Sequence, residues 1–160
     1  MDAQTAIKDS LAMSEMIGMA YLGDLSDAEL MQRPHPQCNH LNWQIGHLVT
    51  SEHSMMSNVE GTHMPALPEG FAAKYTKETA NCDDQAQFAT KDELLQTYQA
   101  QRAATLAALE KATAADLDKP TGVDYAPSLG AMFAMQGAHW MMHCGQWVVV
   151  RRQNDKPVVI

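Results

Sequence analysis

The sequence predicts a single all-α domain built as a four-helix bundle, and three features lead to that class. Apolar residues recur at helical spacing in four long segments, which are separated by capped turns or proline-containing loops. The chain has 12 methionines and few β-branched residues outside Val148, Val149 and Val150, and such side chains favour helices. A length of 160 residues suits one domain with a sizeable core. We therefore expect one domain over residues 1–160, with little or no sheet.

The first predicted helix extends from about residue 5 to residue 22, with Thr5 as its N-cap. A short turn follows, in which Ser26 and Glu29 have the spacing of a capping box. Pro34 and Pro36 then prevent the helix from continuing.

The second predicted helix extends from about residue 39 to residue 59, and Gly61 ends it. From there to about residue 90 the chain contains prolines and glycines without sustained periodicity. We therefore expect a long crossover between the second and third helices, which allows an order other than simple up-and-down.

The third predicted helix begins with a second capping box, formed by Thr90 and Glu93. Residues 113–120 then repeat the pattern of capped turn and proline loop seen after the first helix. Each half of the chain thus has the order helix, capped turn, proline loop, helix. The fourth helix starts with Ser128 as its N-cap and ends near residue 152.

Polar side chains follow one face of the fourth helix, which is otherwise apolar or glycine over residues 129–150. They are Gln136, His139, His143 and Gln146. At helical geometry they lie within a stripe about 80° wide. His139 and His143 are one turn apart on the same face, close enough to bind one ion. The alternative is a pair of hydrogen-bonded core or surface histidines.

The second helix carries a similar stripe beside its apolar positions. Its members are His40, Gln44, His47, Ser51 and Ser54. The stripe either faces solvent or lines the same cleft, and in the second case His47 completes a three-histidine site with an open position for water or substrate. His40 is the first substitute ligand. The remaining histidines are expected at the surface: His35, His53 and His63.

Composition argues against several partners and locations. The net charge is -8, the pI is about 5.2 and no stretch gathers lysines and arginines, so nucleic acid and anionic membranes are disfavoured. The 3 cysteines lack paired spacing, which favours a reducing cytoplasm. The fourth helix is long enough to cross a bilayer, but its polar stripe favours a buried helix of a soluble protein.

Two segments of the chain carry a family resemblance. One is His139-Trp-Met-Met-His143-Cys-Gly145-Gln146, and the other is the stretch around Gly46 and His47 in the second helix. The first matches the His-x-x-x-His-x-Gly-Gln signature of the DinB-like (DinB/YfiT) superfamily of metal-binding bundles, and the second resembles its second-helix motif. The order and spacing of the helices also fit, so the resemblance covers essentially the whole chain.

The resemblance implies an up-down-down-up bundle that holds one divalent metal, most often nickel or zinc, through His47, His139 and His143. It also implies that homodimers are common. Some apolar residues of the fourth helix point away from the polar stripe and are either dimer contacts or ordinary core. They are Phe133, Trp140, Met141 and Val148.

Characterised relatives include enzymes that use a low-molecular-weight thiol such as bacillithiol or mycothiol. An open position on a divalent metal would bind the thiol sulfur and lower its pKa. The first hypothesis is therefore a metal-dependent thiol S-transferase acting on a small-molecule substrate. It has no assigned base, and Gln44, Gln136 and Gln146 are its candidate contacts to the ligands or the substrate.

A metal-dependent hydrolase is the second hypothesis, in which the open position holds a water with a pKa near about 7. Glu52 is the carboxylate nearest to a ligand in the sequence, but it is rotated by about 140° from His47. The third hypothesis is a non-enzymatic, stress-related bundle with a structural metal and a fourth ligand such as His40 or a carboxylate. Nothing in the sequence orients Tyr98, Arg102 and Tyr125, which either border the cleft or, in the favoured interpretation, are ordinary bundle or loop residues.

Overall fold

The computed structural model describes residues 1–159 and is mostly helical. Within those residues, six α-helices, two short 3-10 helices and one two-stranded sheet follow one another. The long helices are α1 (Ala3–Leu22), α3 (Leu41–Ser57), α4 (Lys91–Lys111) and α6 (Leu129–Gln153). The short elements are α2 (Asp27–Leu30), η1 (Ala72–Tyr75), η2 (Gln85–Gln87), α5 (Ala114–Leu117), β1 (Pro120–Val123) and β2 (Ala126–Ser128).

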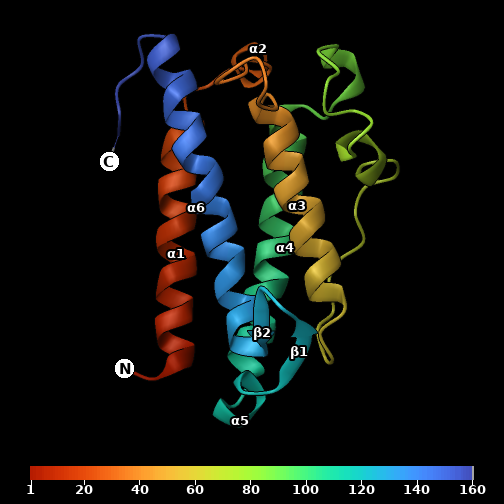
Figure 1. The fold of residues 1–160 in the computed structure, drawn as a ribbon, viewed down its shortest axis with the longest axis vertical. Helices are drawn as coiled ribbons and strands as arrows, with labels where there is room; N and C mark the ends of the chain where they lie inside the picture. The colour runs from red at the N-terminus through yellow and green to blue at the C-terminus, as the bar shows by residue number, and fades with distance from the viewer. Residues whose placement is uncertain (160) are drawn as a thin grey trace.

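The four long helices lie side by side along the long axis of the molecule (Figure 1). Helix α1 packs against α6 and α4, and α3 packs against α4 and α6, so each long helix has two long neighbours. The connection between α3 and α4 spans residues 58–90 and carries η1 and η2. The predicted all-α class with four long helices is confirmed.

Side-chain caps fix where several helices begin. Ser26 with Glu29 and Thr90 with Glu93 form the two predicted capping boxes, in which each side chain bonds the backbone of the other residue. Ser128 caps α6 as predicted, and its hydroxyl accepts the N–H of Ala131. These capping residues therefore predict correctly where α2, α4 and α6 begin.

The N-cap predicted for the first helix is wrong. The carboxylate of Asp2 accepts the backbone N–H of Thr5 at 2.8 Å, and α1 begins at Ala3. Aspartate is a better cap than threonine, so the earlier acceptor starts the helix. Helix α3 begins two residues later than predicted, at Leu41, because the His40 ring caps it.

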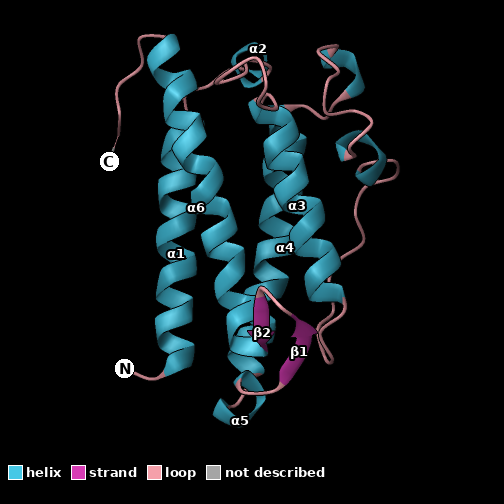
Figure 2. Cartoon of the chain, in the orientation of Figure 1, coloured by secondary structure: helices cyan, strands magenta, loops and turns pink. Residues whose placement is uncertain are grey.

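A small antiparallel hairpin of β1 and β2 is the sheet of the described residues, in line with the prediction of little or no sheet, although its position was not predicted (Figure 2). Its strands have only four and three residues, too few for an alternating pattern to be recognised. Gly122 has φ of 75°, a conformation that glycine adopts at no steric cost. The hairpin leads directly into α6 and lies at the end of the bundle where α3 and α4 finish.

The core lies between the long helices and contains two of the candidate dimer contacts. Phe133 and Trp140 are each 1% exposed, so they are core residues. Val148 is partly buried against the same core, whereas Met141 is 38% exposed. Helices α1 and α6 pack closely at Gly18, where a Cβ atom would lie 1.9 Å from Nε1 of Trp140. Glycine is therefore required at this crossing.

In the part of the chain that the structure describes, no helix is both long and apolar enough to cross a membrane.

Candidate metal centre

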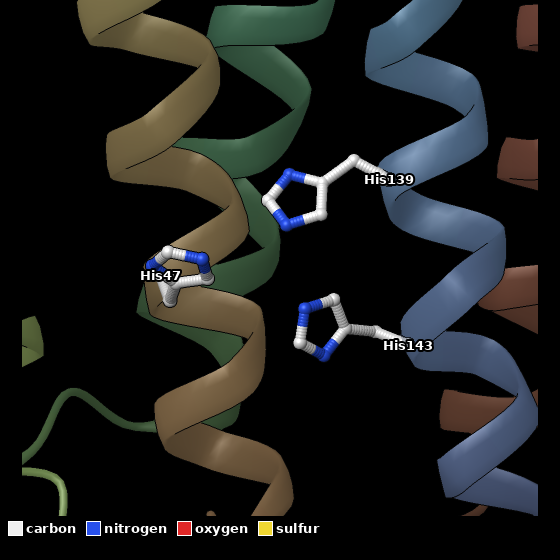
Figure 3. A group of neighbouring side chains, drawn as sticks. All are labelled: His47, His139 and His143. Atoms are coloured by element: carbon white, nitrogen blue, oxygen red, sulfur yellow. The ribbon is translucent and has the colours of Figure 1, made fainter. Parts of the chain in front are cut away.

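Three histidines from two helices meet between α3 and α6 (Figure 3). His47 comes from α3, and His139 and His143 come from consecutive turns of α6. Their candidate ligand nitrogens all lie within 4.8 Å of one another. Because a Zn–N bond is about 2.0–2.1 Å long, small side-chain rotations suffice to place all three nitrogens on one ion. The donor set therefore fits a divalent transition metal.

Close packing around α3 holds His47 in place. The Trp43 ring stacks on the His47 ring, with centroids 5.1 Å apart and planes inclined by 10°. Nε1 of Trp43 donates to the carbonyl of Thr76 and to Oγ1 of Thr79, which anchors the indole. Gly46 allows Tyr75 to pack directly against α3, because a Cβ at position 46 would lie 2.2 Å from the Tyr75 ring.

Burial and mutual repulsion keep the three imidazoles neutral. Burial lowers the pKa of His139, and burial together with His139 lowers the pKa of His47. Burial lowers the pKa of His143 to about 4, with further contributions from the other two rings. A metal binds the neutral ring, so at pH 7 each histidine has a lone pair to offer.

Gln44 connects the ligands to the surrounding helices. Its Oε1 lies 3.0 Å from Nδ1 of His143 and accepts a hydrogen bond from Nε1 of Trp147 at 3.1 Å. Its Nε2 donates to the carbonyl of Asn39 at 2.7 Å and to Oε1 of Gln146 at 3.1 Å. Of the three candidate glutamines, Gln44 thus contacts a ligand and Gln146 contacts Gln44.

Gln136 does not contact the histidines. Its amide donates to the carbonyl of Met132 at 3.0 Å, one turn earlier in α6. A second polar contact to a ligand ring comes from Ser51, whose Oγ lies 3.5 Å from Nδ1 of His47. The polar stripe on α6 therefore divides into a part near the metal centre and a part that packs in the core.

His40 lies outside the histidine cluster, so its prediction as the first substitute ligand is wrong. It is fully buried, and its Nδ1 accepts the backbone N–H of Trp43 at 3.0 Å. Burial, followed by the charge of Arg33, lowers its pKa to about 4. A neutral ring with an acceptor nitrogen acts here as a helix cap. The sequence pattern does not reveal that His40 is the N-cap, because it lies seven residues before His47 on the same polar stripe.

A buried ion pair beside the site was not predicted. Arg102 on α4 donates two hydrogen bonds of 2.9 Å to the two carboxylate oxygens of Glu52 on α3. Glu52 is 3% exposed and Arg102 is 2% exposed. Tyr98 stacks on Trp140 in the core, with centroids 4.2 Å apart. Two of the three residues suggested for the border of the cleft are therefore core residues.

A cavity of about 730 Å³ lies near the hairpin end of the bundle, and Tyr125 lines it. Its walls include apolar side chains from α3 and α6: Met55, Val59, Leu129, Met132 and Phe133. Ser54 in the wall is seven residues after His47, and Met132 is seven residues before His139. Two residues that are seven positions apart in a helix lie on the same face, about 10 Å from each other along the axis. The cavity is therefore lined by the same faces of α3 and α6 that carry the histidines.

The fold and the site define a class of mostly helical proteins with a candidate three-histidine metal centre between two long helices. The family model of the DinB superfamily matches residues 15–147, and the chain belongs to that superfamily. No curated protein matches the chain.

One solved structure with the same fold is described as a conserved protein from Enterococcus faecalis. It is 18% identical to this chain, with a TM-score of 0.67, and the match covers 95% of this chain and 96% of that one. At this identity the likeness extends to the fold alone.

Proposed function

We propose that this protein binds one divalent transition metal ion, nickel or zinc, through His47, His139 and His143, and that it is a thiol S-transferase. The observation that carries the proposal is the convergence of three buried or half-buried imidazoles from two helices. Their lowered pKa values favour the neutral, metal-binding form. Membership of the DinB superfamily supports the same assignment.

A divalent ion bound here would supply Lewis-acid chemistry, lowering the pKa of a thiol that takes its open position. The chain contributes three neutral ligands, which leave the full charge of the ion available for this purpose. His47 and His139 are only half-buried, so this side of the site admits a small thiol from solvent. His143 is only 9% exposed and is the most buried of the three ligands.

The surroundings of the triad favour thiol transfer over the two alternatives. A hydrolase needs a base near its water, and the candidate Glu52 is engaged in the ion pair with Arg102. A closed structural site needs a fourth ligand, and the candidate His40 serves as the cap of α3.

The cavity near the hairpin, which Ser54 and Tyr125 line, is our proposed binding site for the apolar part of the small-molecule substrate. Apolar walls of this kind bury most of a small ligand, while a few polar groups orient it. Lys111 and Lys119 also line the cavity, and Lys119 pairs with Asp116 at 2.7 Å. A substrate lying along the shared α3 and α6 faces would then direct its electrophilic carbon toward the triad.

Two further statements belong to the same proposal. The helices follow the up-down-down-up order of the family, which the long crossover of residues 58–90 and the chain path in Figure 1 support. The chain also forms a homodimer. Exposed apolar side chains on the outer side of α6 support this and would be its contacts: Met141, Met142 and Val149.

Elemental analysis of untagged protein tests the metal centre. We expect about one metal per chain, and we expect its loss in His47→Ala, His139→Ala and His143→Ala without loss of helical signal. His63→Ala is the control, because this exposed histidine lies outside the triad. If the native chain holds no metal after resupply, or if all three variants retain it, the assignment is wrong.

Activity is tested separately by mixing a low-molecular-weight thiol with an electrophilic substrate. The native protein loaded with zinc or nickel should accelerate formation of the thioether, and the His139→Ala variant should not. Metal binding without any thiol transfer over a broad panel of electrophiles would favour the non-enzymatic alternative.

A further inference from the structure

The amide of Gln44 has a defined orientation because two of its neighbours each have a single hydrogen-bonding role. The indole Nε1 of Trp147 can only donate, and it lies 3.1 Å from Oε1 of Gln44. The carbonyl of Asn39 can only accept, and it lies 2.7 Å from Nε2. A flipped amide would face donor with donor and acceptor with acceptor. Gln44 is 1% exposed, so solvent does not compensate such a mismatch.

This orientation determines which nitrogen of His143 carries the proton. Nδ1 of His143 lies 3.0 Å from the same Oε1, and an amide oxygen only accepts hydrogen bonds. The hydrogen must therefore lie on Nδ1. A neutral imidazole has one ring proton, so Nε2 of His143 holds an unprotonated lone pair.

The free nitrogen also points in the required direction. In Figure 3, the ring nitrogen of His143 that lies farther from its own helix faces the other two histidines. The nitrogen nearer to the helix faces away from them. The same contact that fixes the tautomer therefore fixes the ring with its lone pair toward the shared ion position.

We propose that Gln44 is a positioning residue that holds His143 as the Nδ1–H tautomer and so presents Nε2 to the metal. Trp147 and Asn39 orient Gln44 in turn, and together they form a chain of contacts from α6 through α3 to the segment before it. The part that concerns the metal rests on the proposed function, whereas the tautomer is a property of the metal-free chain.

The test compares Gln44→Met with a matched control, Gln101→Met. Methionine has nearly the shape of glutamine but offers neither the amide oxygen nor the amide N–H groups. Gln101 is also 1% exposed, donates to the carbonyl of Pro65 and lies 3.0 Å from Nδ1 of His53. It therefore repeats the chemistry of Gln44 at a histidine outside the triad.

Nitrogen-15 NMR of histidine-labelled, metal-free protein reads the tautomer of His143 directly. We expect the proton on Nδ1 in the native chain and in Gln101→Met, and a mixture of tautomers in Gln44→Met. Titration with Zn²⁺ against a chromophoric chelator should give affinity about 10–100-fold weaker in Gln44→Met, and unchanged affinity in Gln101→Met.

A proton on Nε2 of His143 in the native metal-free protein would overturn the inference, and so would unchanged Zn²⁺ affinity in Gln44→Met. If the native chain shows the Nδ1–H tautomer but binds neither Zn²⁺ nor Ni²⁺, the proposed function fails and the tautomer assignment stands. Helical signal and cooperative unfolding of each variant verify that the comparison is made between folded proteins.

Discussion

Replacing Arg102 by methionine removes one member of a charge pair that the bundle encloses almost completely. The side chains of Arg102 and Glu52 are 2% and 4% exposed, and two hydrogen bonds of 2.9 Å join them. In the variant, the carboxylate of Glu52 stays in the interior without its partner. It must then either remain charged without compensation or take up a proton, and both lower the stability of the fold.

The expected size of the effect follows from this enclosure. Removing one partner of a buried pair costs about 3–5 kcal/mol, whereas replacing both partners by apolar residues is often neutral or stabilising. For a chain of this length, each kcal/mol corresponds to about 2–4 °C in Tm. We therefore expect Arg102→Met to lower Tm by roughly 6–20 °C. The double variant Arg102→Met with Glu52→Leu should recover most of that loss.

Urea and thermal unfolding of the metal-free protein measure these differences, with Glu52→Leu as the fourth corner of the cycle. Lys8→Met is the surface control, since its pair with Glu110 is half exposed and contributes little. A loss below about 1 kcal/mol in Arg102→Met, or a double variant as unstable as the two single losses combined, would refute this account of the pair.

Metal binding, pH and two glycine substitutions give further expected outcomes. Zn²⁺ at 100 times its Kd should stabilise the native chain by about 2.7 kcal/mol and leave His139→Ala unchanged, as thermal unfolding with and without the ion will show. The folded pKa of His40, about 4, lies below the unfolded value of 6.5, so its contribution to stability is complete above pH 6.5 and is lost as the pH falls toward 4. Unfolding measured from pH 7.5 to 4 should show this slope, and His40→Asn, which retains a capping side chain, should reduce it. Gly18→Ala should lower stability by about 1–3 kcal/mol because the new methyl group meets Trp140. Gly145→Ala, which meets nothing within 4 Å, should raise it by up to about 1 kcal/mol, and equal effects at the two glycines would contradict the packing argument.

The sequence was sufficient where the controlling signal is local. Capping residues such as Thr90 and Ser128 bond their own helix, so their spacing alone predicts where α4 and α6 begin. The pairing of His139 with His143 also follows from the helical repeat. The third member, His47, needed the family motif, because periodicity left its stripe free to face either solvent or the cleft.

Features that depend on distant parts of the chain were not predictable in the same way. Arg102 pairs with Glu52, which lies 50 residues earlier in the sequence. The residues around each position resemble those around a charged side chain exposed to solvent. His143 and Trp147 contact Gln44 from positions 99 and 103 residues away, and these contacts distinguish Gln44 from Gln136, which packs in the core. Such choices are made by the packing of whole helices, which a single sequence does not display.

The internal repeat gives the three-histidine site a further meaning. The first half of the chain ends in α3 and supplies one histidine, while the second half ends in α6 and supplies two. An ion held by all three would therefore cross-link positions 47 and 139, which are 92 residues apart (139 − 47 = 92). A cross-link over a loop of about 100 residues lowers the conformational entropy of the unfolded chain. This raises the free energy of unfolding by up to about 4.7 kcal/mol. Neither half alone contains a complete ligand set, so holding the ion depends on the two halves staying together.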